Sequence, residues 1–331
     1  MKTIFDSTAL GAMVLKNRIW RSATWMALSA DGKVGDELVE VYREYAHGQV
    51  AAIITGLTSI SPYDEDLYGG VKFWDDSDLE GHRKLTDAIH AEGSLIYMQT
   101  AMVDGDVNGW PLERLQEIIG QFGNAAARAQ KAGYDGVQIH AAHFFFLSKF
   151  ISPAVNCRTD EYGGSQENRS RILVDILEDM RRKTGPGFSI IVKVNASDFV
   201  PGGLDVEGYL TTCRMLSEAG IDAIEVSANG TSVPGVKAGK NEAYFREYAE
   251  ALKQVVDTPV ILVGGHRSIE AMNTLINVIG IEYLSMSRPL IREPNLIKRW
   301  MDGDTRPALC VSCNSCYRTP GHACIFKLRG M

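Results

Sequence analysis

Residues 134–153 read Tyr-Asp-Gly-Val-Gln-Ile-His-Ala-Ala-His-Phe-Phe-Phe-Leu-Ser-Lys-Phe-Ile-Ser-Pro. The apolar run that ends at Ile139 predicts a short buried strand, and His140 and His143 follow it three residues apart. At a strand-to-helix turn this spacing can direct both imidazoles at one point, where two neutral rings could hold an oxygen atom and stabilise negative charge on it. The alternative is a pair of structural histidines at a helix start, which this stretch alone favours.

The same pattern of a short apolar strand followed by an amphipathic helix recurs along the chain. Strands are predicted at residues 18–23, 51–58, 94–100, 136–140, 189–195, 223–227, 259–263 and 283–287. Helices are predicted at residues 38–47, 78–91, 112–129, 169–184, 206–219, 244–256, 269–278 and 296–301. Eight such units predict an α/β fold, a (β/α)8 TIM barrel forming a single domain over residues 1–303, with a short cysteine-containing C-terminal tail at 304–331. A doubly wound sheet is the alternative, but Ser22-Ala23-Thr24 after the first strand is not its glycine-rich fingerprint.

Composition narrows the class of protein further. The 331 residues are 45% apolar and carry a net charge of −7, which disfavours nucleic acid as a partner. The sequence shows no signal peptide and no apolar run long enough to cross a bilayer. We therefore expect a cytoplasmic protein without a membrane partner, in which cysteines are reduced or bind metal. Cys157 and Cys213 are expected to be ordinary buried residues.

In a TIM barrel the chemistry gathers where the strands end, at the carboxyl face. The residues predicted there form a polar, convergent set with a cation at each end, which suits a large, flat, anionic cofactor. The cofactor-binding candidates are Ser22, Ala23, Thr24, Gly56, Gln99, Lys193, Gly264, Gly265, Ser287 and Arg288, and the catalytic candidates are His140 and His143.

The two cations have structural alternatives that the sequence leaves open. Gly264-Gly265 lets backbone N–H groups approach a phosphate, Ser268 could start a helix behind it, and Arg288 adds a charged fork, unless that arginine pairs with Glu282 or Glu293. Lys193 needs an anionic partner, either the N1–C2=O edge of a reduced flavin or a structural carboxylate.

Four cysteines stand close together in the tail. Cys310, Cys313, Cys316 and Cys324 have the spacing C-x2-C-x2-C-x7-C. Four soft ligands this close can hold a [4Fe-4S] cluster or a tetrahedral zinc ion, and the sequence leaves cluster, zinc and no metal all open.

Several segments together resemble the Old Yellow Enzyme family of FMN-dependent NAD(P)H oxidoreductases. They are Lys16 to Ile19, Gly136 to Pro153, the dense loop from Asp160 through Asn168, Arg169 and Arg171, Gly264-Gly265 and Ser287-Arg288. The resemblance covers about residues 4 to 300.

This resemblance implies hydride transfer from NADH or NADPH through FMN N5 to an activated alkene. His140 and His143 would hold the carbonyl oxygen of that alkene, and Lys193 would replace the usual arginine beside flavin N1. The usual proton-donating tyrosine is replaced by Phe145, which cannot donate.

The first three tail cysteines resemble the cluster site of the larger trimethylamine dehydrogenase and dienoyl-CoA reductase relatives. The alternative functions are therefore a flavin dehydrogenase or demethylase, or a low-turnover electron-transfer flavoprotein, that passes electrons through this site. The expected partners are a small-molecule substrate and further copies of the chain.

Overall fold

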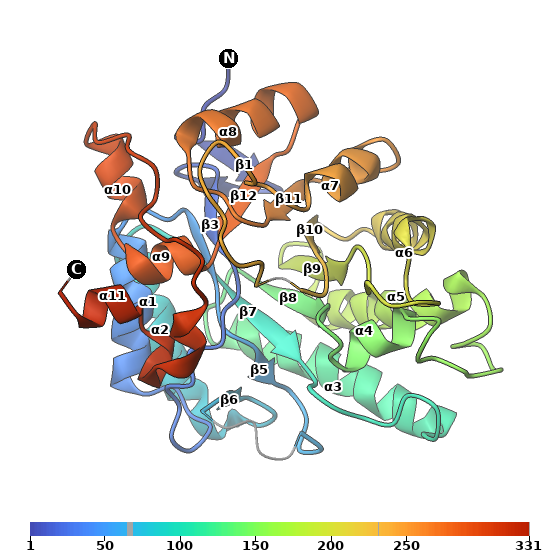
Figure 1. Ribbon diagram of the computed structural model, residues 1–331. Coiled ribbons are helices and arrows are strands. Elements are labelled where there is room, and N and C mark those ends of the chain that lie inside the picture. Colours follow the sequence, from blue (N-terminus) through green and yellow to red (C-terminus); the bar gives the residue numbers. More distant parts are fainter. Residues whose placement is uncertain (65–68, 231, 331) are drawn as a thin grey trace.

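The computed structural model describes residues 1–64, 69–230 and 232–330 and shows a closed parallel barrel (Figure 1). Its eight strands are β3 (Ile19–Arg21), β4 (Ala52–Ile54), β7 (Leu95–Ala101), β8 (Gly136–Ala141), β9 (Ser189–Asn195), β10 (Ala223–Ser227), β11 (Val260–Val263) and β12 (Tyr283–Met286). Each pairs in parallel with the next, and β12 pairs with β3 to close the ring. The predicted (β/α)8 barrel is confirmed.

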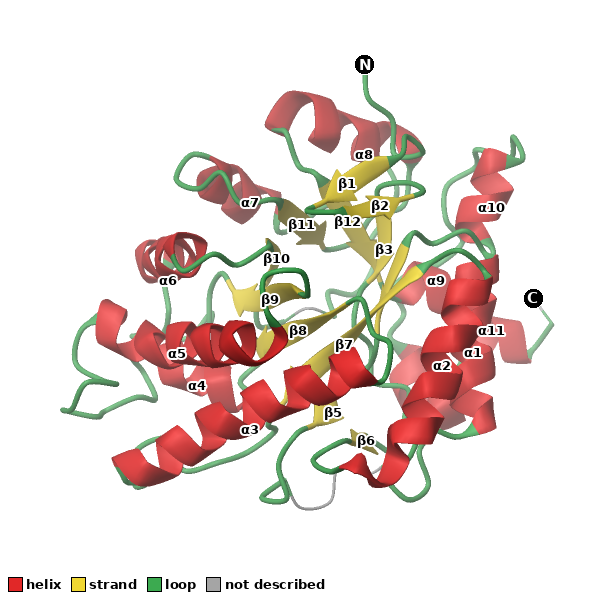
Figure 2. Cartoon of the chain, turned by 180° about the vertical axis from the view of Figure 1, so that it is seen from behind, coloured by secondary structure: helices red, strands yellow, loops and turns green. Residues whose placement is uncertain are grey.

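Helices surround the strands on the outside, as Figure 2 shows from the opposite side. They are α1 (Asp36–His47), α2 (Leu79–Ala91), α3 (Leu112–Lys131), α5 (Gln166–Thr184), α6 (Val206–Glu218), α7 (Arg246–Lys253), α8 (Ile269–Thr274) and α10 (Leu296–Met301). The apolar stripe predicted on α3 faces the barrel, since Leu115, Ile118 and Phe122 are fully buried. These eight helices correspond to the predicted ones, with ends that differ by a few residues.

The structure contains short elements that apolar periodicity did not predict. A hairpin of β1 (Thr8–Leu10) and β2 (Met13–Leu15) lies outside the barrel sheet, β5 (Thr58–Ser59) and β6 (Val71–Lys72) extend the sheet, and α4 (Phe146–Ile151) and α9 (Arg288–Arg292) follow β8 and β12. Each has two to six residues, which is too few for the apolar period of a strand or a helix to be recognised.

The hairpin closes the amino-terminal end of the barrel. Its Leu10 and Leu15 belong to one buried cluster with Trp20, Tyr97 and Tyr283 from three barrel strands. The hydroxyl of Tyr283 donates to a hairpin carbonyl at 2.6 Å. The barrel therefore has an apolar floor, and its open end is the carboxyl face where the polar candidates were predicted.

The C-terminal tail, at residues 304–330, packs against the barrel side. It contains the 3-10 turns Ser315–Arg318 and Pro320–His322 and the short helix α11 (Ile325–Leu328). Figure 1 shows α11 beside α1, where Lys327 and Glu44 form an ion pair at 3.2 Å. The tail thus returns toward the first βα unit, and this brings part of it to the barrel mouth.

Candidate functional site

A pocket with a cavity volume of about 240 Å³ opens at the carboxyl ends of the strands. Of the predicted catalytic and cofactor-binding residues, those that line it are Ser22, Ala23, Thr24, Gln99, His140, His143, Lys193, Gly264, Gly265, Ser287 and Arg288. The structure therefore brings together side chains from strands far apart in sequence.

Gly56 is the predicted pocket residue that lies elsewhere. It is absent from the pocket wall and lines a smaller hollow behind it. Its backbone packs against Thr24, because a Cβ at Gly56 would lie 2.7 Å from the Thr24 carbonyl oxygen. Gly56 thus allows two barrel loops to approach each other, rather than contributing a surface to the cavity.

One end of the pocket combines a glycine turn with the Arg288 side chain. Gly264 and Gly265 have φ values of 129° and 83°, and a Cβ on Gly265 would lie 2.8 Å from the Tyr244 ring. Only glycine fits this turn, where the backbone itself faces the cavity.

Arg288, at the same end, pairs with neither Glu282 nor Glu293, its two possible partners in the sequence. Glu282 pairs with Lys253 at 2.6 Å and Glu293 pairs with Arg299 at 3.0 Å. Within the described part of the chain, Arg288 donates to Asn314 Oδ1 and the Val233 carbonyl and has no carboxylate partner. Its positive charge therefore remains available to a phosphate.

The helix behind the glycine turn plays a different part from the one expected. Ser268 is the N-cap of α8, as predicted, but its side chain does not cap the helix. Instead the Glu242 carboxylate accepts from the Ser268 N–H at 2.8 Å and from the Ser268 hydroxyl at 2.7 Å. A protein carboxylate thus already occupies this helix start, so the glycines and Arg288 are the phosphate candidates.

The other end of the pocket rests on a buried polar layer. Lys193 lies 3.1 Å from the Glu225 carboxylate and donates to Ser22 Oγ at 2.9 Å. Lys193 also lines the pocket, whereas Glu225 lies beneath it and is fully buried. The two explanations that the sequence left open for Lys193 are therefore compatible, since the lysine has a structural carboxylate and still faces the cavity.

The two histidines face the pocket from one turn, with ring centroids 5.1 Å apart and an interplanar angle of 82°. His143 and Phe144 have φ values of 65° and 60°, a strained conformation for residues other than glycine. Asn195 at the end of β9 stabilises this turn, since its Oδ1 accepts from the His143 N–H at 2.9 Å.

Both rings are neutral at ordinary pH. Burial, and then the nearby Lys193 charge, lowers the pKa of His140 to about 3. Burial, His140 and Lys193 hold the pKa of His143 well below its usual value. The Ala142 N–H donates to His140 Nδ1 at 3.3 Å, which leaves the proton of the neutral ring on Nε2.

Phe145 lies where the resemblance implies a proton donor. Its ring lines the pocket and contacts His140 with a centroid distance of 4.9 Å. Phe146, the next residue, instead turns into the fold and packs on Trp110. Of Phe144, Phe145 and Phe146, only Phe145 thus belongs to the pocket wall, and its ring cannot donate a proton.

The tail contributes pocket residues that sequence reasoning missed. Tyr317 and His322 line the pocket, and the His322 ring meets Trp25 edge-on with centroids 5.3 Å apart. Tyr317 and His322 also contact each other at 5.7 Å. No spacing rule links residues 317 and 322 to the first strand, so only the chain path could reveal this contact.

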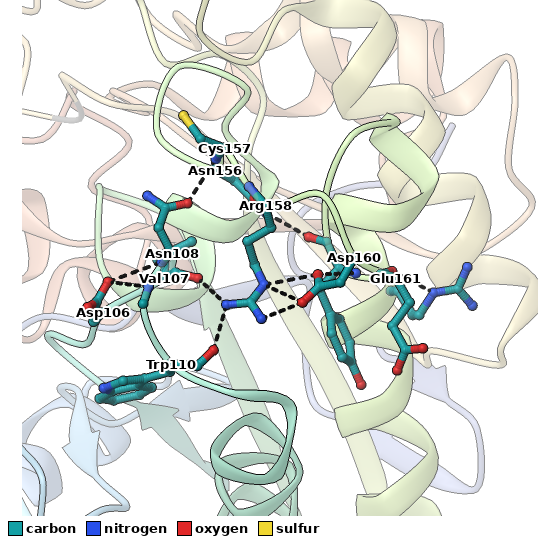
Figure 3. A network of polar contacts seen from close by, with 12 residues as sticks. Asp106, Val107, Asn108, Trp110, Asn156, Cys157, Arg158, Asp160 and Glu161 are labelled. Carbon is teal, nitrogen blue, oxygen red and sulfur yellow. Dashed lines mark hydrogen bonds and ion pairs between the residues drawn. The ribbon is translucent and has the colours of Figure 1, made fainter.

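The dense loop beginning at Arg158 does not line the pocket. Figure 3 shows Arg158 held between Asp160 and two backbone carbonyls of the loop after β7. Its Nη1 donates to the carbonyls of Val107 and Trp110 at 2.8 Å each. Ser165 then caps α5, because its side chain accepts from the Asn168 N–H at 3.2 Å. This loop therefore anchors two neighbouring βα connections.

Cys157, the residue before this loop, was expected to be buried, and that prediction is wrong. Cys157 is exposed, whereas Cys213 is fully buried as expected. The backbone N–H of Cys157 donates to Asn108 Oδ1 at 2.9 Å (Figure 3), which fixes this residue on a surface connection.

The four tail cysteines line one small hollow with a cavity volume of about 20 Å³, next to Arg288. Within the described residues, no three His, Cys, Asp or Glu side chains are arranged to hold a single metal ion. The choice between a cluster, zinc and no metal, which the sequence left open, therefore stays a prediction.

This fold and site define a class, the flavin-binding TIM-barrel oxidoreductases. The sequence profile of the NADH:flavin oxidoreductase / NADH oxidase family matches residues 3–108 and 111–305. The chain belongs to this family of FMN-dependent oxidoreductases, which includes the Old Yellow Enzymes, so the predicted family, fold and FMN and NAD(P)H cofactors are confirmed.

Named relatives agree with this assignment. An NADPH dehydrogenase from Bacillus subtilis is 31% identical over 88% of this chain and 92% of its own length. A 4,4'-dithiodibutanoate disulfide reductase from Rhodococcus erythropolis is 26% identical over 98% of this chain and 95% of its own. An old yellow enzyme homologue from Zymomonas mobilis shares the fold, with a TM-score of 0.77 and 23% identity over 91% of this chain and 93% of that one. The chain spans about half the length of some other curated relatives.

Proposed function

We propose that this chain takes electrons from NADH or NADPH and reduces an activated alkene whose carbonyl oxygen lies between His140 and His143. The observation that carries the proposal is this pair of buried, neutral imidazoles on the wall of the same pocket as Lys193 and Gln99. The N–H group of a neutral imidazole can donate a hydrogen bond to an oxygen on which negative charge grows, and this bond stabilises the charge.

The residues present fit FMN. The glycine turn and Arg288 suit its phosphate, and a buried lysine and an amide suit the N1–C2=O and N3–H edge of its ring. When bound, FMN supplies hydride exchange through its N5 atom. The chain itself binds and orients: Gly264, Gly265 and Arg288 hold the anion, and Lys193 and Gln99 hold the pyrimidine edge.

The histidines would orient the acceptor and polarise it. His140 donates from Nε2, while His143 Nε2 and Ser227 Oγ are hydrogen-bonded at 2.9 Å. Since Phe145 cannot donate the one proton that must accompany the hydride, alkene reduction requires water or another group as the proton donor. Tyr317 and His322 are the tail side chains on the pocket wall that can move a proton.

A second candidate function follows from the cysteine hollow. It is a dehydrogenase or electron-transfer flavoprotein in which Cys310, Cys313, Cys316 and Cys324 hold a [4Fe-4S] cluster. Its support is that Arg288 lines both the cysteine hollow and the flavin pocket. In this proposal residues 304–331 are a separate cluster-binding tail on the barrel of residues 1–303.

The visible spectrum of anaerobically purified protein, before and after NADPH, tests both candidates. Flavin bands that bleach, followed by recovery of the bands when an enone is added, support the first. A broad brown absorption that is lost on replacing Cys313 with Ala supports the second. Protein that takes up no FMN would contradict both.

Three expectations from the sequence stay predictions. They are that the chain self-associates, that it binds no nucleic acid and that it is cytoplasmic. Among the described residues, no helix is long and apolar enough to cross a membrane.

A further inference from the structure

The inside of this barrel carries a polar layer between its apolar floor and its mouth. TIM-barrel interiors are usually filled by layers of branched apolar side chains. Here the buried interior positions, one just after β3 and the others within strands, are all polar or charged: Ser22, Gln99, Gln138, Lys193, Glu225 and Ser285. They form one connected network, and its only carboxylate is that of Glu225.

Glu225 accepts from most of this layer. Its Oε1 accepts from the hydroxyls of Ser22 at 2.7 Å and Ser285 at 2.6 Å. Its Oε2 accepts from Gln138 Nε2 at 2.7 Å and lies 3.1 Å from Lys193 Nζ. Burial alone would raise the pKa of Glu225, but the Lys193 charge and these hydrogen bonds lower it overall, so the carboxylate is ionised.

One consequence concerns the orientation of Gln99. An ionised carboxylate can only accept, so Gln138 must turn its NH2 group toward Glu225 and its oxygen away. Gln99 Nε2 then donates to Gln138 Oε1 at 2.8 Å. The carbonyl oxygen of Gln99 is therefore left for the pocket. The Glu225 carboxylate thus fixes, through Gln138, which end of the Gln99 amide is the acceptor.

A second consequence concerns charge. An unpaired Lys193 would place a full positive charge against the pocket floor. Glu225, with its carboxylate 3.1 Å from the ammonium and away from the pocket, neutralises most of that charge while leaving the lysine N–H groups in place as donors.

We propose that Glu225 is a positioning residue for the flavin: it fixes the acceptor side of Gln99 toward the pyrimidine edge and cancels the charge of Lys193. The proposal rests on the proposed placement of that edge over Lys193 and Gln99. Because a positive charge near N1 stabilises reduced flavin, Glu225 keeps the bound flavin a stronger hydride donor than Lys193 alone would.

The test compares FMN binding and midpoint potential in variants of the full chain. Glu225→Gln keeps the volume but removes the charge. We expect the ratio of reduced-FMN to oxidised-FMN affinity to rise at least tenfold over the wild type, which raises the two-electron potential by at least about 30 mV. Gln138→Met removes the hydrogen-bonded link between Glu225 and Gln99 and leaves both charges in place. It should weaken oxidised FMN several-fold and change the ratio of reduced to oxidised affinities less than threefold.

A double variant separates charge from packing. Glu225→Gln with Lys193→Met removes both charges, which buried pairs tolerate better than the loss of one partner. Its potential should fall to the wild-type value or below. Glu282→Gln, which removes the carboxylate that pairs with Lys253 away from the pocket, is the matched control and should leave the potential unchanged.

The outcomes distinguish this inference from the proposed function. A Glu225→Gln potential equal to or below the wild type, or a double variant as high as the single one, would overturn the role of Glu225 while FMN binding stands. If the wild-type chain binds no FMN, the proposed function fails first.

Discussion

The oxygen-binding role of the histidine pair makes a quantitative prediction for His140→Ala. The Ala142 N–H occupies Nδ1, so the ring has a single donor, Nε2–H, and the substitution removes one hydrogen bond to a developing oxyanion. Loss of one such donor typically costs ~2.7–4 kcal/mol, which corresponds to a 10²–10³-fold lower rate. We expect this loss in kcat for an enone reduced by the wild-type enzyme.

The double variant with His143→Ala should lose less than the product of the two single effects, because both rings act on one oxygen atom. The assay has two parts. Stopped-flow mixing of NADPH-reduced protein with the enone measures the oxidative half-reaction, and titration with a phenol measures oxygen binding without turnover. FMN content should stay near the wild-type value, since neither histidine contacts the phosphate end of the pocket.

His90→Ala is the matched control. His90 pairs with the Asp135 carboxylate at 2.9 Å, lies on α2 and is absent from the pocket wall. It should leave the enone rate and phenol affinity unchanged. Unaltered phenol affinity and an unaltered oxidative half-reaction in the double variant would refute the oxygen-binding role.

Three further predictions use other parts of the structure. Arg288→Ala should weaken FMN binding ten- to a hundredfold, measured by fluorescence titration, because an unpaired charge at the anion end is lost; full flavin retention would contradict its phosphate role. Phe145→Tyr places a hydroxyl on a ring that already faces the pocket, and it should speed alkene reduction by up to ~10²-fold, with a pH-dependent rate as its signature; no change in rate would show that protonation is not limiting. The buried rings of His82, His140 and His266 have pKa values lowered by burial to about 3, about 3 and about 4, so unfolding lets them take up protons below pH 6.5. Stability is therefore retained above pH 6.5 and lost as pH falls, by about 1.4 kcal/mol per histidine at pH 5.5; these three rings together contribute about 4 kcal/mol to the loss of unfolding free energy between pH 7.5 and 5.5, and equal denaturant midpoints would contradict buried neutral rings.

The sequence by itself determined the barrel and most of its mouth. Each strand is a short run buried on both faces, and each helix has an apolar stripe, so the pattern of eight units is local information. Once the units form a barrel, the residue at each strand end must face the mouth. That is why His140, Lys193 and Gln99 could be placed together from their positions alone.

Only the tertiary structure decided which residue each of them contacts. Glu225 looked like an ordinary strand residue, and Arg288 had two possible carboxylate partners in the sequence. The barrel closes β12 onto β3 and sets β10 beside β9, so Glu225 lies opposite Lys193, and Arg288 is left without a carboxylate among the described residues. Tyr317 and His322 reach the pocket because the tail folds back over the first βα unit. These contacts depend on strand order and chain path, which are global properties that no local residue pattern contains.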